Sequence, residues 1–271
     1  MDLEYFKNIT HKIHGVDFSV YDESFFSGII EKRMKKIQSS SLEDYCELVL
    51  AHKTELQELI KNFNVNYSEF FRNSLTYSVL EHLVLPDLLQ KKINHNKLEV
   101  RIWSAACAAG QEPYSVAILF EELLNGKVNA PGYRIFATDQ SEANVDEGRK
   151  GLYQPLSLNK ITIQRLNKWF TKTNDQYAVN AEVRQNIDFS VFNLLDERQM
   201  CPKASIFGGF DIILLCNILF YYTETTRHQI IRKIEHCAAA GAYLVTGETE
   251  REILLQSGFS EVYPYSCIFV K

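Results

Sequence analysis

The residues best suited to chemistry lie in one short stretch, which reads Arg101-Ile-Trp-Ser-Ala-Ala-Cys-Ala-Ala-Gly110-Gln-Glu112-Pro113-Tyr114. An apolar run passes into small residues and a glycine. A proline then suits the first turn of a helix, because its missing N–H would have no partner there. Small residues let a backbone approach a ligand closely, and ligands of open α/β sheets bind at the carboxyl ends of strands. The stretch predicts a nucleotide-like ligand over Ala106–Gly110.

Two acidic residues accompany this loop. Asp139 ends the run Phe136-Ala-Thr-Asp139 and suits the hydroxyls of a ribose, but it is equally a cap for a helix over residues 141–148. Glu112 is either a polar contact to the ligand or a first-turn acid favoured by the helix dipole. Gly110 is also compatible with an ordinary strand-to-helix turn, and it is one glycine where a dinucleotide-binding loop has three. These features favour a ribose-bearing ligand and leave NAD and S-adenosylmethionine both open.

Two regimes of hydrophobic periodicity surround these residues. Up to about residue 90 the three- and four-residue spacing is typical of amphipathic helices. We expect helices over residues 24–38, 42–50, 56–63 and 77–89. From Leu98, short β-rich runs alternate with helical stretches, which predicts βαβ units and a mostly parallel sheet. The strands are expected at residues 100–106, 133–138, 187–192, 211–215 and 242–246, with two short ones within 261–271.

The connection over residues 151–182 is too long for a plain loop. We expect it to form a small subdomain with a helix near residues 163–170 and a turn at residues 173–175.

Composition narrows the class of protein. The chain has 271 residues, enough for two cores, and its net charge of −5 argues against a surface built for nucleic acid. No apolar run approaches the roughly 20 residues of a membrane span, and the N-terminus lacks the apolar core of a secretory signal. The six cysteines are scattered, without zinc-site spacing, and are expected to be reduced thiols of a cytoplasmic protein.

Several motifs follow in order along the chain. They are Asn66-Tyr-Ser68-Glu-Phe70-Phe71-Arg72, Ser104–Ser115, Phe136–Asp139, Gly148-Arg-Lys-Gly151-Leu-Tyr153, Phe192-Asn193-Leu194-Leu195, Asp211–Tyr221 and Gly241–Glu250. In this register they resemble the motifs of the chemotaxis receptor methyltransferase (CheR) family, whose cofactor loop typically reads SAACSTGEEPYS. The resemblance spans roughly residues 20–271.

The resemblance implies an α/β fold. An all-helical N-terminal domain would be followed by a doubly wound, mostly parallel sheet of the Rossmann-like class I methyltransferase type, with an antiparallel C-terminal strand and a small inserted subdomain. The helical domain, for receptor docking and as a lid, is expected at residues 1–92. The S-adenosylmethionine-binding domain is expected at residues 93–271, with the inserted subdomain at about 151–186.

The resemblance also implies roles by position. The cofactor-binding residues would be Asn66, Ser68, Arg72, Ala106, Gly110, Glu112, Asp139, Asn193, Leu194, Cys216 and Asn217. Within this set, Glu112 would hold the amino-acid end of the cofactor and Asp139 the ribose. Arg72 would also clamp the substrate carboxylate, and Tyr221 would lie beside the reacting methyl group.

The implied reaction transfers a methyl group from S-adenosylmethionine to a glutamate side chain of a chemoreceptor. The products are a methyl ester and S-adenosylhomocysteine, and no metal is needed. A glutamate with a pKa of about 4.3 is already ionised at neutral pH, so no general base is required. Guanidinium binds carboxylate through two parallel hydrogen bonds, which suits Arg72 as the clamp.

The sequence departs from the family at several positions. The usual Cys-Arg-Asn is Leu215-Cys216-Asn217, so an arginine is lost near the cofactor. If that arginine made a charged hydrogen bond, its loss weakens binding by about 1–3 kcal/mol. The alternative function is therefore a non-catalytic regulatory protein that binds S-adenosylmethionine or S-adenosylhomocysteine.

In the family, basic residues on an N-terminal helix face the receptor's methylation helices. Here the corresponding cluster is Lys32, Arg33, Lys35 and Lys36, which also suits a plain solvated helix face. The stretch Lys172–Tyr177 is short and lacks the glycine of family members that bind a receptor tail peptide, so no high-affinity tail-peptide tether is expected. Neither nucleic-acid binding nor membrane insertion is expected, and the chain is expected to be a monomer.

Overall fold

A computed structural model of the chain describes residues 2–63, 67–127 and 130–271. Its contacts form two compact units. The helical unit comprises Met1–Val65 and Ile218–Gln229, and the sheet unit comprises Asn66–Asn217 and Ile230–Lys271. The expected boundary near residue 92 differs from this division, because the helical stretch that precedes the sheet packs on the sheet and belongs to its unit.

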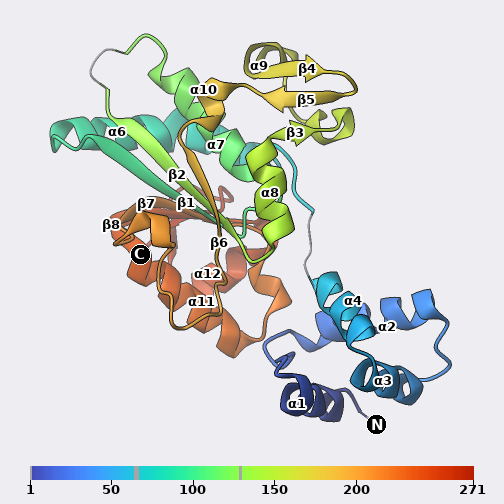
Figure 1. Cartoon of the computed structure of the whole chain (residues 1–271). Coiled ribbons are helices and arrows are strands. Elements are labelled where there is room, and N and C mark those ends of the chain that lie inside the picture. The colour runs from blue at the N-terminus through green and yellow to red at the C-terminus, as the bar shows by residue number, and fades with distance from the viewer. Residues whose placement is uncertain (1, 64–66, 128–129) are drawn as a thin grey trace. The chain divides into compact units, whose positions relative to one another are not determined.

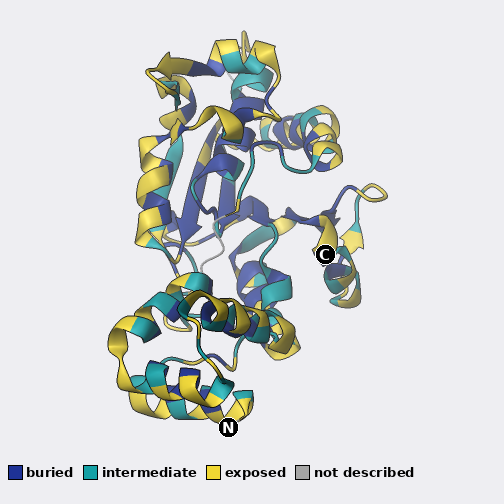
Figure 2. Cartoon of the chain, turned by 90° about the vertical axis from the view of Figure 1, so that its right-hand side faces the viewer, coloured by how far each residue is buried: buried dark blue, intermediate teal, exposed yellow. Residues whose placement is uncertain are grey.

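Four helices form the N-terminal part of the helical unit: α1 (Leu3–His14), α2 (Glu23–Ile37), α3 (Leu42–Ala51) and α4 (Lys53–Phe63). The last three confirm the predicted helices, whereas α1 was not predicted. Side chains of Asp2, Asp22 and Ser41 cap the backbone N–H groups at the starts of α1, α2 and α3. The apolar faces of the helices meet in a core rich in phenylalanine, including Phe6, Phe18, Phe26 and Phe63. Figure 2 shows that their outward faces are exposed.

Residues 218–229 complete the helical unit. They include a short 3-10 turn, η4 (Leu219–Tyr221), and the first part of α11 (Glu224–Cys237). Tyr222 forms an isolated antiparallel bridge with Tyr21, and their rings stack 5.4 Å apart. The helical unit is therefore built from two separate parts of the sequence.

The sheet unit begins with one helical stretch, α5 (Ser74–Val79), η1 (Leu80–Val84) and α6 (Leu85–Asn94). It confirms the predicted fourth helix and extends it at both ends. A π turn at η1 precedes Pro86, which has no N–H for the regular α-helical ladder. Buried residues of the stretch, among them Leu85, Leu88 and Leu89, join the main core of the sheet.

The central sheet has seven strands in the order β6-β2-β1-β7-β8-β10-β9. Their bounds are β1 (Glu99–Ala105), β2 (Gly132–Asp139), β6 (Ile187–Val191), β7 (Phe210–Leu215), β8 (Ala238–Thr246), β9 (Ser260–Glu261) and β10 (Ile268–Val270). The first five are mutually parallel, and β10 is antiparallel to both β8 and β9. This topology confirms the predicted Rossmann-like class I methyltransferase fold.

Outside the inserted subdomain, the sheet unit also contains α7 (Gln111–Leu124), α8 (Glu142–Lys150), the last part of α11, α12 (Arg251–Gln256) and the short turns η3 (Lys203–Ser205) and η5 (Glu248–Glu250). Figure 1 shows α6 and α7 on one side of the sheet and α12 on the other, as a doubly wound fold requires. In the described part of the chain, no helix is long and apolar enough to cross a bilayer.

The expected subdomain is present between α8 and β6. It contains β3 (Leu152–Tyr153), η2 (Pro155–Leu158), α9 (Ile163–Trp169), β4 (Phe170–Thr173), β5 (Gln176–Val179) and α10 (Ala181–Arg184). Its three strands form a separate antiparallel sheet in the order β3-β5-β4. The predicted turn joins β4 to β5, with Asn174 in the left-handed region at φ 55°.

One expectation about the cysteines is wrong. Cys201 and Cys237 form a disulfide, with their Cα atoms 6.0 Å apart. The pair joins the loop before β7 to the end of α11 across a separation of 36 residues, which scattered cysteines in apolar runs did not indicate. Cys46, Cys107, Cys216 and Cys267 are free thiols.

Candidate cofactor and active site

The loop between β1 and α7 has an unusual backbone. Ala106, Ala108 and Gly110 all adopt positive φ, at 64°, 48° and 91°. At Gly110 a Cβ atom would lie 3.1 Å from the Cα of Gly148 and from the hydroxyl of Tyr153. Glycine is therefore favoured at this position by both conformation and space. The loop is held by a hydrogen bond of 2.8 Å from the Cys107 N–H to the Thr138 carbonyl.

Asp139 ties this loop to the end of β2. Its Oδ2 accepts from the Ala108 N–H at 3.0 Å, and its Oδ1 accepts from the Ser141 N–H at 2.9 Å and from Asn144 Nδ2 at 3.1 Å. A carboxylate has about four acceptor positions, so these bonds leave about one free for a ribose hydroxyl. Burial raises the pKa of Asp139. Asp139 thus stabilises the start of α8 and also borders the predicted site.

Glu112 turns back from the first turn of α7 toward β1. Ser104 Oγ donates to its Oε1 at 2.6 Å. Burial raises the pKa of Glu112 to about 7, against smaller opposing effects of Ser104, of the Cys216 thiol and of the Arg72 charge. The carboxyl group is therefore an acid poised near neutrality, close to both Arg72 and Cys216.

Cys216 and Asn217 follow the carboxyl end of β7. Asn217 has φ 60°, and its N–H donates to Glu250 Oε2 at 2.7 Å. The same Oε2 accepts from the Gly247 N–H at 2.9 Å, so the fully buried Glu250 joins the ends of β7 and β8. Sequence reasoning did not single out Glu250 or Ser104, although both lie inside motifs that carried the resemblance.

The segment that precedes α5 carries three more predicted residues. Asn66 lies outside the described residues. Ser68 is half-buried, and the guanidinium of half-buried Arg72 lies 5.0 Å from the centre of the Tyr67 ring. The Phe71 N–H donates to Ser115 Oγ on α7 at 3.1 Å. Contacts thus place Ser68 and Arg72 in the sheet unit, rather than in a helical domain ending at residue 92.

Asn193 and Leu194 follow the end of β6. The Asn193 side chain accepts from the Leu195 N–H at 2.9 Å, and Leu194 is buried. The preceding Phe192 N–H donates to the Asp139 carbonyl at 2.9 Å. These residues therefore lie next to Asp139 at the carboxyl edge of the sheet.

Tyr221 belongs to the helical unit. Its ring lies 4.5 Å from that of Phe25, and its carbonyl accepts from the Asp22 N–H at 2.9 Å. Asp22 also caps α2, so the expected docking helix and Tyr221 are directly connected.

Two buried polar atoms at the carboxyl edge support a polar ligand. Gln111 Oε1, at the first residue of α7, and Thr246 Oγ1, at the last residue of β8, have no hydrogen-bond partner within the described ranges. Buried polar atoms without partners are costly, and a bound ligand or water would satisfy them. The residues present therefore fit a polar nucleotide lying across the strand ends.

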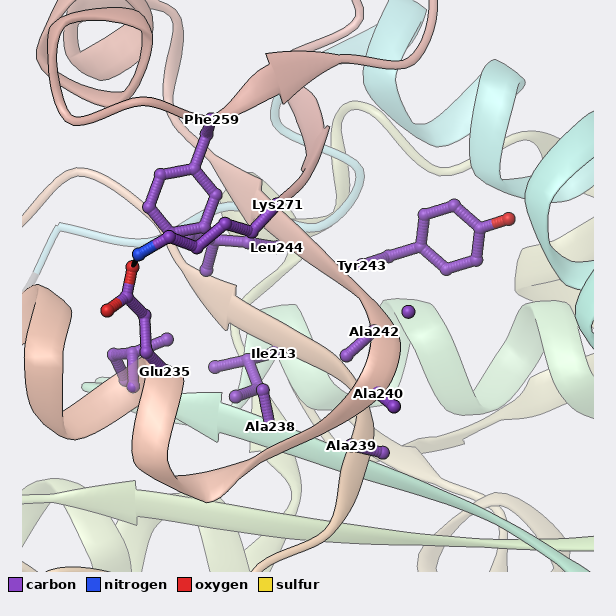
Figure 3. Close-up of a pocket in the computed structure, with 12 residues that line it drawn as sticks. Ile213, Glu235, Ala238, Ala239, Ala240, Ala242, Tyr243, Leu244, Phe259 and Lys271 are labelled. Atoms are coloured by element: carbon purple, nitrogen blue, oxygen red, sulfur yellow. Dashed lines mark hydrogen bonds and ion pairs between the residues drawn. The ribbon is translucent and has the colours of Figure 1, made fainter.

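Within the described ranges, no group of three or more His, Cys, Asp or Glu residues could hold a metal ion. A cavity of about 280 Å³ lies elsewhere in the sheet unit, and Figure 3 shows the residues that line it. It is lined by Ile213, Ile234, Phe259 and small residues of β8 such as Ala238 and Ala242, and none of the predicted cofactor residues lines it. Because these β8 residues precede the carboxyl end of the strand, the cavity is distinct from the predicted site.

The basic cluster on α2 is less uniform than its sequence suggests. Lys32, Lys35 and Lys36 are exposed, but Arg33 is 4% exposed. Arg33 donates to both carboxylate oxygens of Glu55, at 2.9 and 2.6 Å. The expectation that Arg33 contributes to docking is therefore wrong, because its charge is used inside the helical unit.

The fold is that of a class I methyltransferase domain. Residues 66–262 match the family model of the CheR methyltransferase SAM-binding domain, and residues 1–63 match that of the CheR methyltransferase all-alpha domain. The chain belongs to the CheR methyltransferase family.

Individual relatives agree with this assignment. The chain is 30% identical to the chemotaxis protein methyltransferase of Listeria innocua, covering 92% of this chain and 90% of the relative. It is also 30% identical to chemotaxis protein methyltransferase 1 of Pseudomonas aeruginosa, covering 92% and 89%. It spans only 25% of an uncharacterized 104.1 kDa protein of Rhodobacter capsulatus, with 29% identity over 90% of this chain.

Proposed function

We propose that the chain is a cytoplasmic protein-glutamate O-methyltransferase that esterifies glutamate side chains of a chemoreceptor. The observation that carries the proposal is the retention of Glu112, Asp139 and Arg72 in one unit at the carboxyl edge of a family-matched sheet. The chemotaxis names of the relatives support a receptor substrate.

The proposed roles follow the chemistry of the side chains. S-adenosylmethionine supplies an activated methyl group on its sulfonium. Glu112 receives the ligand's amino group, Asp139 accepts from a ribose hydroxyl, and Asn193 and Leu194 border the adenine. Ser68, Asn217 and Cys216 line the pocket with the backbone of Ala106 and Gly110, while Asn66 is assigned from the motif alone.

Arg72 and Tyr221 are the residues proposed to touch the reacting groups. Arg72 orients the substrate carboxylate, which is ionised without help at neutral pH. Since a guanidinium also stabilises that anion before reaction, its benefit comes from orientation, and positioning of this kind supplies several kcal/mol, on the order of measured intramolecular effects.

The test is transfer of labelled methyl from S-adenosylmethionine to a chemoreceptor cytoplasmic fragment. The expected product releases labelled methanol under mild base, because methyl esters are base-labile. The matched control is the same fragment with its candidate glutamates changed to glutamine. Base-stable label, or equal label in the control, would refute the proposal. Arg72→Ala is expected to lose most of the turnover.

A second candidate is a non-catalytic regulator that binds the same ligand. The observation that favours it is Cys216, a thiol beside Glu112 where the family has an arginine. Calorimetry with S-adenosylhomocysteine separates the two functions when combined with the transfer assay. Binding without any methyl transfer to receptor fragments would establish the regulator instead.

Docking is proposed through the exposed Lys32, Lys35 and Lys36 of α2, which suit a glutamate-rich receptor segment. The turn between β4 and β5 lacks glycine and is short. We therefore expect no high-affinity tail-peptide tether, and micromolar binding of a receptor C-terminal peptide in calorimetry would contradict this. A monomer is expected in solution, and sedimentation measures it.

A further inference from the structure

The segment that carries Arg72, residues 67–73, makes polar and apolar contacts with the inserted subdomain of residues 151–186. Lys160 of the subdomain makes two contacts with it. Its Nζ lies 2.5 Å from Glu69 Oε2 and donates to the backbone carbonyl of Arg72 at 3.2 Å. Glu69 in turn accepts from the Tyr67 hydroxyl at 2.7 Å, and the Tyr67 ring lies 5.0 Å from the Arg72 guanidinium. A single ammonium group therefore fixes both the backbone and the ring beside Arg72.

Arg165 of α9 contacts Phe71, the residue before Arg72. Its guanidinium lies 4.8 Å from the centre of the Phe71 ring. The guanidinium is itself oriented by Glu122 of α7, at 2.7 and 3.0 Å, and by Glu81 of the π turn, at 2.7 Å. Trp169 Nε1 donates to the other oxygen of Glu122 at 2.9 Å. This network links α9, α7 and the π turn at the base of the Arg72 segment.

The apolar contacts of the Arg72 segment are also made with the inserted subdomain. Phe70 is fully buried, and its ring meets two subdomain rings edge-on, Tyr153 at 4.9 Å and Phe170 at 5.5 Å. Tyr153 also donates its hydroxyl to the carbonyl of Ala109 in the cofactor loop, at 2.7 Å. The subdomain thus touches both the Arg72 segment and the loop on which the nucleotide is expected to lie.

We infer that Lys160 and Arg165 are positioning residues, through which the inserted subdomain sets the place of Arg72 in the active site. The inference rests on the proposed function, because Arg72 is taken there to contact the cofactor and the substrate carboxylate. It assigns the subdomain a role in catalysis that does not depend on a receptor tail. Lys160 acts through Glu69 and the Arg72 carbonyl, and Arg165 acts through Phe71.

The test compares Lys160→Met with Lys172→Met, a matched loss of charge at an exposed residue of β4 in the same subdomain. Calorimetry measures the dissociation constant for S-adenosylhomocysteine, and thermal unfolding of the ligand-free proteins checks the fold. We expect Lys160→Met to weaken binding at least fivefold, with Lys172→Met within twofold of the wild type. Lys160→Arg is expected to restore binding, since arginine can keep both contacts. Arg165→Lys, which keeps the charge, provides a second probe if larger changes at residue 165 impair folding.

A double-variant comparison distinguishes positioning from general support. If Lys160 acts through Arg72, Lys160→Met adds less than twofold in an Arg72→Ala background. An equal loss in both backgrounds, or wild-type affinity of Lys160→Met, would overturn the inference and leave the proposed function standing. Failure of the wild-type chain to bind S-adenosylhomocysteine would overturn both.

Discussion

Glu112 is half-buried between groups with opposing effects on its ionisation. Loss of solvent and the like charge of Glu250 favour the neutral acid. The hydrogen bonds from the Ser104 hydroxyl and the Cys216 thiol and the charge of Arg72 favour the carboxylate, and the influence of Arg72 is the smallest of the five. Loss of solvent outweighs the opposing effects and raises the pKa of Glu112 to about 7.

This titration predicts a pH-dependent affinity. An ionised Glu112 suits the ammonium group of S-adenosylhomocysteine, whereas the protonated acid, which dominates below its pKa of about 7, does not. Affinity should therefore fall as pH is lowered, by up to about tenfold per pH unit. Calorimetry between about pH 5.5 and 7.5, where an α-amino group stays mostly charged, measures the effect. Glu112→Gln should bind weakly and without this dependence, and an equally steep profile in that variant would contradict the assignment.

A second prediction at this scale concerns Gly247. A Cβ atom there would lie 2.4 Å from Asn217 Nδ2, so Gly247→Ala must displace the Asn217 side chain. We expect about fivefold weaker binding of S-adenosylhomocysteine, since one lost hydrogen bond is worth about 1 kcal/mol. Gly28→Ala is the control, because it lies in α2 with open space at its Cβ position. Unchanged affinity of Gly247→Ala would remove Asn217 from the site.

Among the helices and strands, α2 carries both the lysines proposed for docking and a cap that contacts Tyr221. Its lysines Lys32, Lys35 and Lys36 are exposed. Arg33 instead forms an ion pair with Glu55, which also accepts a hydrogen bond from the Tyr45 hydroxyl. The start of the same helix holds Tyr221 through Asp22 and Phe25. The lysines proposed for docking and the residues that contact Tyr221, which is proposed to touch the reacting groups, therefore lie on the same helix.

This arrangement predicts opposite effects for neighbouring basic residues. Arg33→Ala leaves the mostly covered carboxylate of Glu55 without its ion-pair partner, with only the Tyr45 hydroxyl to satisfy it, which should lower the free energy of unfolding by about 3 kcal/mol. Lys35→Ala should change it by less than about 0.5 kcal/mol but slow methyl transfer to an acidic receptor fragment at low salt. Urea unfolding and initial rates measure the two effects. If Arg33→Ala were as stable as the wild type but transferred methyl groups slowly, Arg33 would have to be assigned to docking after all.

At the scale of the whole molecule, the disulfide is a feature with a direct chemical readout. The chain has six cysteines, so the bonded pair Cys201–Cys237 leaves four free thiols. We expect four reactive thiols after denaturation without reductant and six after reduction. Because the closed loop spans 36 residues, Cys201→Ser should lower stability by up to about 4 kcal/mol relative to the oxidised protein. Six reactive thiols before reduction would show that the pair is open in the isolated protein.

The sheet was predictable from the sequence because its strands are short apolar runs bounded by polar residues, as at β7 and β2. The turn from β1 into α7 was predictable because small residues and Gly110 separate an apolar run from Pro113. The division into units was not, since amphipathic periodicity over α5 to α6 reveals an apolar face but not the core that it joins. The burial of Arg33 was also not predictable, because its partner Glu55 is 22 residues further along the sequence.

The discontinuity of the helical unit limits how this protein can be recombined. A chimera that exchanged only residues 1–65 with a relative would pair foreign helices with the native Tyr221 and Tyr222, and so lose the fit to Tyr21 and Phe25. An exchange of the N-terminal helices with those of a relative therefore requires residues 218–229 to be exchanged together with them.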